Sequence, residues 1–378
     1  MRTKHLFLNC LFLTFALFLT SAFAQDYIKP GLLEGPKMRL GKGAVNDLKF
    51  SPDSTRLAVA SSCGIWIYDA YTGNELDFLT GPMEGINSVD FSPDGKIIVS
   101  GSKDGTVKLW DTTIGKHLKT LREHVWDVNS VCFSLDGRII ASGSAYGTLR
   151  LWNATTGKHL KKLRGHTAGI NSVCFSPDST IIASGSKDGT VRLWDATTGK
   201  HLKKLSPSVS DVNSVSFSPD GKIIAGVSTT GIELWDATIG KHLRKLQEDK
   251  RAVPMISSNI CFSPDGKKIV IGNMNGTVRL WSVSDVSKVD YLETSSRNQG
   301  DAVNSVCFSP DGKMIAYGTQ NGIVELLDAI TRKHLGQLAG RAEKSNDIGS
   351  KGPTWGINSI NFSPDGKIIA SSASILSL

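Results

Sequence analysis

Histidines are the side chains of this sequence best suited to metal binding or proton transfer, and most of them recur at one place of a repeated segment. The recurring histidines are His117, His159, His201, His242 and His334. A metal or nucleophilic site needs such groups to converge on one atom, whereas a repeat spreads them over separate units. We therefore expect solvated strand residues here, and we predict no catalytic residue, no metal site and no cofactor.

Other catalytic motifs are missing from the sequence as well. It has no glycine-rich phosphate loop and no paired-carboxylate signature. Asp-Gly pairs such as Asp94-Gly95 recur, but they lack the ligand series of a calcium loop and are typical of hairpin turns. These patterns disfavour an enzyme and favour a binding protein.

The cysteines form a second repeated set. Beyond the first 24 residues they are Cys63, Cys132, Cys174, Cys261 and Cys307. The last four each precede a repeated phenylalanine, and equivalent points on neighbouring units should lie farther apart than a disulfide allows. We expect five free thiols that act as small strand residues.

The first 24 residues have the features of a secretory signal. Arg2 and Lys4 precede an apolar run from Leu6 to Leu19, and residues 22–24 read Ala-Phe-Ala, a typical cleavage site. An uncleaved membrane anchor is the alternative. We expect export to the periplasm or the extracellular space, a linker at 25–35, and no membrane span in the mature chain.

Charge must be corrected for this cleavage. The whole chain has 43 basic and 35 acidic residues, a net charge of +8. Removing Arg2 and Lys4 leaves 41 minus 35, or +6. Many of the lysines fall in the last strand of each repeat, where they should discourage edge-to-edge association. A basic rim could also meet an anionic surface, but no aromatic residues interleave to stack bases, so we predict no specific nucleic-acid partner.

A Phe-Ser-x-Asp marker sets the organisation of residues 36–378. It occurs at Phe50, Phe91, Phe133, Phe175, Phe217, Phe262, Phe308 and Phe362, at intervals of 41, 42, 42, 42, 45, 46 and 54 residues. This period suits a blade of four antiparallel strands. The repeat units lie near residues 44–79, 86–122, 128–164, 170–205, 212–246, 256–292, 302–338 and 357–378.

The unit at residues 170–205 is the most regular. Residues 170–175 are β-branched and aromatic-rich, which predicts a strand, and a Ser-Pro-Asp-Ser turn follows. Residues 180–184, 190–195 and 201–205 predict three further strands, separated by Asp188-Gly189 and Thr198-Gly199 turns. The four strands, named a to d in order, form a meander without a helix.

Paired Gly165-His166 and Trp194-Asp195, with Ser-Pro-Asp turns between them, resemble the WD-repeat family of β-propellers. The resemblance covers about residues 36–378 and suggests an exported member of bacterial type. Repeats one and seven depart from the pattern, with Tyr68-Asp69 and Leu327-Asp328. The implied fold is all-β, an eight-bladed β-propeller of four-stranded antiparallel blades.

The resemblance also implies a tetrad of buried polar side chains that satisfy one another's hydrogen bonds. It maps fully onto one repeat, as His166, Ser184, Asp188 and Trp194. The preceding repeat keeps the histidine, serine and tryptophan but has Tyr146 in place of the aspartate. We expect the tetrad to be a local staple in a ring that depends mainly on packing between blades.

Ring closure needs a partner for the last repeat. Repeat eight is expected to supply strands a, b and a short c, and residues 36–40 would then pair beside it as strand d. Such a closure removes open sheet edges. The alternative is seven blades plus an extra repeat.

Seven repeats open strand a with an asparagine: Asn46, Asn87, Asn129, Asn171, Asn213, Asn304 and Asn358. We expect these side chains to cap the preceding d-to-a turn. The alternative is a polar collar at the mouth of the central channel.

Binding residues should lie on the face that carries the d-to-a connections and the b-to-c turns, here called the top face. Our candidates there are Trp126, Tyr146, Met255, Met274 and Trp355. Trp and Met are enriched at interfaces, although the indoles could instead fold onto a neighbouring blade. Longer connections, including 339–356, lie on the same face after blades five to seven.

The function predicted from these features is a non-catalytic scaffold that binds an unknown protein, or a glycan, through the top face of a monomeric ring. The alternative is an exported propeller enzyme with a site in the central channel. Convergence of histidine and carboxylate side chains at the channel mouth would distinguish the enzyme, and the sequence offers asparagine and serine there.

Overall fold

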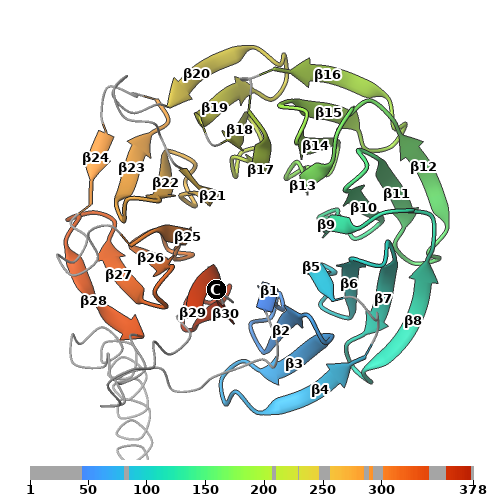
Figure 1. Cartoon of the computed structure of the whole chain (residues 1–378), viewed down its shortest axis with the longest axis horizontal. Coiled ribbons are helices and arrows are strands. Elements are labelled where there is room, and N and C mark those ends of the chain that lie inside the picture. The colour runs from blue at the N-terminus through green and yellow to red at the C-terminus, as the bar shows by residue number, and fades with distance from the viewer. Residues whose placement is uncertain are drawn as a thin grey trace, which may run out of the picture.

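The computed structural model describes residues 45–80, 85–206, 210–228, 230–246, 256–284, 289–292, 301–339 and 355–375. These residues form thirty strands and, within those ranges, no helix. The strands are grouped in seven four-stranded antiparallel sheets and one two-stranded sheet. Figure 1 shows the sheets arranged as blades around a central axis.

The strand bounds of blades one to four follow. Blade one holds β1 (Val45–Phe50), β2 (Arg56–Ser61), β3 (Ile65–Asp69) and β4 (Glu75–Leu79). Blade two holds β5 (Ile86–Phe91), β6 (Ile97–Ser102), β7 (Val107–Asp111) and β8 (Lys116–Leu121). Blade three holds β9 (Val128–Phe133), β10 (Ile139–Ser144), β11 (Leu149–Asn153) and β12 (His159–Leu163). Blade four holds β13 (Ile170–Phe175), β14 (Ile181–Ser186), β15 (Val191–Asp195) and β16 (His201–Leu205).

The remaining sheets continue the same order. Blade five holds β17 (Val212–Phe217), β18 (Ile223–Ser228), β19 (Gly231–Asp236) and β20 (His242–Leu246). Blade six holds β21 (Ile256–Phe262), β22 (Lys268–Asn273), β23 (Val278–Ser282) and β24 (Val289–Tyr291). Blade seven holds β25 (Val303–Phe308), β26 (Met314–Thr319), β27 (Val324–Asp328) and β28 (His334–Ala339). The two-stranded sheet holds β29 (Trp355–Phe362) and β30 (Ile369–Ile375).

The meander predicted for residues 170–205 is confirmed in blade four, where β13 to β16 pair in sequence order. The turn after β13 is stabilised by Ser176, whose hydroxyl donates to Asp178 at 2.6 Å and accepts the N–H of Ile181 at 2.9 Å. Ser179 closes it with a φ of 62°, where sister repeats have glycine. The Ser-Pro-Asp motif thus makes its own hydrogen-bonded hairpin.

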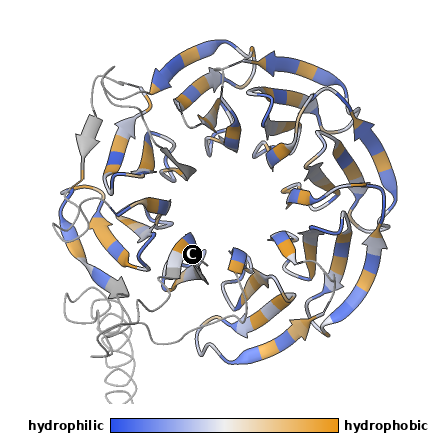
Figure 2. Cartoon of the chain, viewed as in Figure 1, coloured by the Kyte–Doolittle hydropathy of each residue, from blue (hydrophilic) through white to orange (hydrophobic). Residues whose placement is uncertain are grey.

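The hydrophobic core lies between blades. One cluster joins Leu149 and Leu163 of blade three to Ile170, Val173 and Trp194 of blade four, and each of the five is at most 5% exposed. Similar clusters fill the other junctions. In Figure 2 hydrophobic segments alternate with hydrophilic ones along the strands. A blade therefore buries its two apolar faces only by stacking on both neighbours.

The expectation of eight four-stranded blades is wrong. The structure is a seven-bladed propeller, and repeat eight contributes only the two-stranded sheet β29–β30 among the described residues. Each complete blade ends its b-to-c turn with a glycine, whereas Ala373, Ser374 and Ile375 continue β30 and pair with β29. Among the described residues β30 therefore continues as far as Ile375, and no turn into a strand c follows it there. The expected strand at residues 36–40 lies outside the described residues.

The two-stranded sheet nevertheless sits in the ring between blade seven and blade one, with β29 against β25 and β1 (Figure 1). Three hydrogen bonds join it to blade one. Asn361 donates to the carbonyl of Leu48 at 3.1 Å, and the N–H of Asp365 donates to Ser54 at 3.0 Å. The Asp365 carboxylate accepts the Tyr71 hydroxyl at 2.6 Å. These bonds connect the two ends of the described ring.

The asparagines that open strand a link neighbouring blades. Their amides donate to carbonyls of the next blade, Asn46 to Ile86 (2.7 Å), Asn87 to Val128 (3.2 Å), Asn129 to Ile170 (2.9 Å) and Asn171 to Val212 (3.0 Å). The expected capping of the preceding turn is therefore wrong for these four residues. Adjacent inner strands are instead tied together by side chains, because their backbones do not pair.

Candidate partner-binding face

The top face is defined by backbone hydrogen bonds between the b-to-c turn and the residue before strand a in blades two, three, four and seven. The N–H of Ala145 donates to the carbonyl of Asp127 at 2.8 Å, and the N–H of Lys187 donates to Gly169 at 2.8 Å. The d-to-a connections and the b-to-c turns therefore lie together, as the sequence predicts. A side chain on either segment can reach the same partner.

An exposed aromatic stack stands on this face in blade three. Trp126, from the β8–β9 connection, is 54% exposed, and Tyr146, from the β10–β11 turn, is 72% exposed. Their ring centroids lie 6.0 Å apart with an interplanar angle of 15°. Val125 beside them is 87% exposed. The alternative in which the Trp126 indole folds down onto a neighbouring blade does not hold, and Trp126, Tyr146 and Val125 are called the aromatic platform below.

Backbone contacts hold the aromatic platform in place. Gly147 closes the β10–β11 turn with a φ of 72°, and a Cβ there would lie 2.7 Å from the carbonyl oxygen of Ala168. On the other side, Gly105 of blade two packs against the carbonyl oxygens of His124 and Trp126, 3.0 and 3.3 Å from its ideal Cβ. The loop that carries Trp126 is thus enclosed by turns of blades two and three.

Tyr146 occupies the position of the tetrad aspartate, and a threonine of the same turn is the partner that remains for the histidine. The Nδ1 atom of His124 lies 3.1 Å from the Thr148 hydroxyl, and its Nε2 atom lies 2.8 Å from Ser142. The indole of Trp152 donates to the same serine at 2.8 Å. Burial, with Arg150 and Lys162 nearby, lowers the pKa of His124 to about 3. The sequence did not reveal the threonine, because it lies two residues beyond the aspartate position.

The complete tetrad occurs in blade four, as a continuous chain of hydrogen bonds. The indole of Trp194 donates to Ser184 at 2.9 Å, and the Ser184 hydroxyl lies 2.8 Å from Nε2 of His166. The Nδ1 atom of His166 lies 2.9 Å from the Asp188 carboxylate. Ser184 and Trp194 are fully buried, so these side chains staple the blade and are closed to a ligand.

None of the other predicted binding residues is described next to the aromatic platform. Met274, 48% exposed, lies in the β22–β23 turn of blade six, across the ring from blade three (Figure 1). Trp355 begins β29, but its side chain is outside the described residues, as is the whole of Met255. Their part in binding stays a prediction.

Comparison with known families fits this architecture. The family "IFT122 first beta-propeller" matches residues 127–299, and "WD domain, G-beta repeat" matches residues 35–69, 73–111 and 348–374. "Anaphase-promoting complex subunit 4 WD40 domain" matches residues 288–349. Between them these propeller families span most of residues 35–374. The chain is a WD-repeat β-propeller.

Named relatives share short stretches with this WD-repeat propeller. Serine-threonine kinase receptor-associated protein of Gallus gallus is 37% identical over 83 residues, 22% of this chain and 24% of that protein. WD repeat-containing protein 1 of Gallus gallus is 44% identical over 71 residues, 18% of this chain and 12% of that protein. Target of rapamycin complex subunit wat1 of Schizosaccharomyces pombe is 38% identical over 69 residues, 18% of this chain and 22% of that protein. The chain thus spans about a quarter or less of the length of these eukaryotic relatives.

A solved structure matches over a much larger part of the chain. The crystal structure of the computationally designed Ika8 protein has a TM-score of 0.72 and 26% sequence identity. The match covers 88% of this WD-repeat propeller and 94% of the designed chain.

The strand-d histidines of the propeller pack against its tryptophans. The rings of His117, His159 and His201 pack edge-to-face on the tryptophan of strand c in the same blade. The distances between ring centroids are 5.1, 5.2 and 5.0 Å. His242 also lies 2.5 Å from the buried carboxylate of Glu233. The expectation of solvated strand residues holds for His117, His201 and His242, which are exposed, and each of these rings also packs on the edge of a tryptophan. They remain on separate blades and do not converge.

The channel-side cysteines are free thiols that accept hydrogen bonds across blade junctions. The N–H of Phe308 donates to the sulfur of Cys261 at 3.4 Å. Burial raises the pKa of Cys174 to about 12, although its thiol accepts the N–H of Phe217 in the next blade. In blade two the equivalent position is occupied by Asp90, whose carboxylate accepts the N–H of Phe133 at 2.9 Å. The thiols take the place of this carboxylate in their own blades. Their position before the marker phenylalanine is explained by this link.

The charged side chains of the inner strands gather at the junction of blades one and two. Burial raises the pKa of Asp47 and of Asp90. Desolvation lowers the pKa of Lys49, but the negative charges of Asp47 and Asp90 outweigh this effect. The net result is a raised pKa of Lys49. Asp47 also accepts the N–H of Val89 at 3.0 Å. Both carboxylates thus have structural partners, so this group is a poor acid–base centre.

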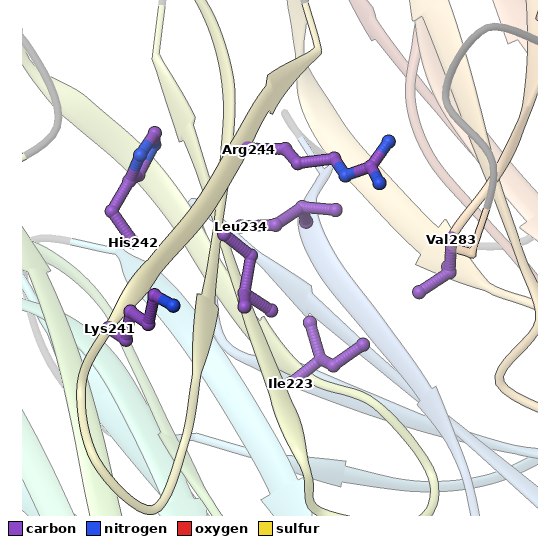
Figure 3. Close-up of a pocket in the computed structure, with 7 residues that line it drawn as sticks. Ile223, Leu234, Lys241, His242, Arg244 and Val283 are labelled. Carbon is purple, nitrogen blue, oxygen red and sulfur yellow. The ribbon is translucent and has the colours of Figure 1, made fainter.

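A hollow of about 340 Å³ opens at the outer edge between blades five and six (Figure 3). Ile223 and Leu234 of blade five and Val283 of blade six supply its apolar wall. Lys241, just before β20, and Arg244 of β20 flank it. It lies on the rim rather than the top face, so it is separate from the aromatic platform.

The described part of the chain offers no other chemical centre. No group of three or more histidine, cysteine, aspartate or glutamate side chains there could hold a metal ion. Nor does any helix among those residues have the length and apolar character to cross a membrane. What the geometry does offer is a rigid ring with one exposed aromatic feature on its loop face.

Proposed function

We propose that this chain is a non-catalytic scaffold that binds a protein partner through its top face, with the aromatic platform at the centre of the contact. The observation that carries this proposal is the parallel stack of Trp126 and Tyr146, each more than half exposed on connections of a rigid ring. Exposed tryptophan and tyrosine are the side chains that most often dominate binding energy at protein interfaces.

A scaffold fits the rest of the molecule better than an enzyme. The histidines described above are engaged by serine, threonine, glutamate or indole partners, and the inner carboxylates accept backbone N–H groups. Two of the similar proteins carry names that refer to association with a receptor kinase or membership of a complex. That similarity supports a role in holding other proteins.

The binding surface is proposed to extend from the aromatic platform around the top face to Met274, Met255 and Trp355. We also propose that the chain is an exported protein of bacterial type and a monomeric ring. The support for export is the signal-like composition of residues 1–24.

The test is to capture partners with the tagged full-length protein from the organism that encodes it, and then to measure the affinity of the purified partner by calorimetry. Trp126→Ala should weaken binding by about 2 kcal/mol, roughly thirtyfold, and Tyr146→Ala should act in the same direction. The melting temperature should stay unchanged, because both side chains are exposed.

Ile114→Ala is the matched control, since Ile114 is 68% exposed but lies in the c-to-d turn on the opposite face. If Trp126→Ala binds as well as the wild type, or if Ile114→Ala loses as much affinity, the platform is not the binding site. If the protein bound a glycan on an array and Trp126→Ala abolished that binding, the ligand of the platform would be a carbohydrate and not a protein.

A further inference from the structure

A β-bulge recurs in the outermost strand of six blades. In blade three Leu151 pairs with Lys161 and Trp152 pairs with His159, so Leu160 between them has no cross-strand partner. In all six blades the skipped residue is a leucine: Leu76, Leu118, Leu160, Leu202, Leu243 and Leu335. A bulge turns a side chain away from the regular pleat.

The bulge exposes these leucines to solvent. Leu118, Leu160, Leu202 and Leu243 are 42, 40, 39 and 42% exposed, whereas the leucine that ends each strand is buried, as Leu163 and Leu205 are. Figure 2 shows hydrophobic bands interrupting the hydrophilic colour of the outermost strands. Lysine alone would protect a sheet edge from pairing. The repeated outward leucine has no such explanation.

The leucines of blades two to five lie in strongly basic surroundings. The exposed cations in or next to their strands are Lys116, Lys119, Arg122, Lys158, Lys161, Lys162, Arg164, Lys200, Lys203, Lys204, Lys241 and Arg244. Blade one differs, because Glu75 and Asp77 flank its bulged Leu76. We call Leu118, Leu160, Leu202, Leu243 and these cations the rim band.

The spacing of the leucines indicates what kind of surface could cover them. Each stands a full blade from the next, among cations, so together they form no contiguous apolar patch. A folded partner buries a continuous apolar core at its interface, which this arrangement cannot provide. A fluid surface of anionic headgroups can take each leucine separately and pair with the lysines between them.

We infer that the rim band docks on an anionic lipid surface. Leucine side chains enter the boundary between headgroups and acyl chains, while the lysines bind the headgroup phosphates. Because the blades form a ring, only part of the rim band faces a flat bilayer at one time. This surface is separate from the aromatic platform, so the inference goes beyond the proposed function and leaves the top face available to a protein.

The experiment is co-sedimentation of the full chain with vesicles of equal parts phosphatidylcholine and phosphatidylglycerol, and with vesicles of phosphatidylcholine alone. The protein should sediment only with the anionic vesicles, and added salt should release it. The variant with Leu118→Ser, Leu160→Ser, Leu202→Ser and Leu243→Ser keeps every charge and should bind about tenfold more weakly.

Leu76→Ser is the matched control, because it makes the same change at the same bulge in acidic surroundings, and it should bind like the wild type. Trp126→Ala should also bind vesicles normally, which separates this inference from the proposed function. Failure to bind anionic vesicles would overturn the inference. If the fourfold leucine variant bound as well as the wild type, the basic residues alone would account for binding. That result would also overturn the inference.

Discussion

At the scale of single residues, Asp188 has more hydrogen-bond donors than an amide could satisfy. It accepts Nδ1 of His166, the N–H of Thr167, and both the N–H and the hydroxyl of Thr190, at 2.6 to 3.0 Å. Burial opposes its ionisation, but these donors outweigh burial and hold the pKa of Asp188 at about 2. Asp188→Asn turns an NH₂ group toward two of the donors, and should lower the free energy of unfolding by about 1–3 kcal/mol.

Urea denaturation at neutral pH measures this loss, and Asp104→Asn supplies the control. Asp104 occupies the same Lys-Asp-Gly-Thr turn in blade two, but the N–H and the hydroxyl of Thr106 both donate to its Oδ1 atom. An asparagine keeps that oxygen, so Asp104→Asn should cost much less. Equal losses for the two variants would mean that the His166 contact adds nothing to stability.

A second prediction concerns pH and His124. Its pKa is 6.5 in the unfolded chain and about 3 in the fold, so between these values the unfolded state binds a proton that the folded state does not. Stability is therefore lost as the pH falls from 6.5 toward 3. His124→Gln should flatten the plot of unfolding free energy against pH in this window.

His166→Gln is the comparison, because burial also lowers the pKa of His166 but Asp188 opposes the shift. His166→Gln should therefore change the slope of unfolding free energy against pH less than His124→Gln does. A slope that is unchanged in His124→Gln would show that this imidazole does not control the acid sensitivity of the ring.

Residue types alone indicated the aromatic platform only in part. Trp126 and Tyr146 were chosen from their positions in the repeat, but their contact depends on a turn and a connection whose residues are 20 apart in sequence. The contact between Thr148 and His124 does not follow from the sequence pattern. It depends on where a side chain points, which spacing does not determine.

At the scale of strands, glycine in strand b sets how closely two blades approach. A Cβ on Gly185 would lie 2.7 Å from Cγ1 of Val212 and 2.8 Å from Cγ1 of Val215, both in blade five. Gly185→Ala should therefore lower the free energy of unfolding by about 1–3 kcal/mol through overpacking.

The double variant Gly185→Ala with Val212→Ala tests the cause. Removing the Val212 methyl groups makes room for the new Cβ, so the two losses should be less than additive in a double-mutant cycle. Additive losses would place the cost of Gly185→Ala in the strand itself and not at the junction.

The strands of blade four followed closely from β-branched residues and turn motifs, since these act within one repeat. The links between blades did not. Asn171 was expected to cap its own turn and instead donates to Val212, because the geometry of the next blade decides which carbonyl lies within reach. Local patterns fix a hairpin, whereas contacts between repeats need the curvature of the ring.

At the scale of the whole molecule, export is the prediction that sequence makes and the described residues do not test. If the protein is secreted in its own host, cleavage after Ala24 should leave Gln25 at the new N-terminus. Mass spectrometry of the protein recovered from the periplasm or medium measures this directly. An intact Met1 in the mature protein would contradict the signal peptide.

The sequence pattern predicts one blade more than the structure contains. Eight markers were counted correctly, but a marker reports only the a-to-b hairpin. Repeat eight has that hairpin in β29 and β30 and lacks the glycine turn that would start a third strand. Counting complete blades requires the later turns as well.

The charged group at the first junction has a consequence for assembly of the ring. Repeats this similar can stack on the wrong neighbour during folding, and the serine and cysteine links are nearly interchangeable. The junction of blades one and two is different, because Lys49 of blade one and Asp90 of blade two are oppositely charged and the serine and cysteine links carry no charge. The charges at this one junction favour blade two as the neighbour of blade one during folding. Correct pairing there sets the order in which the other blades stack.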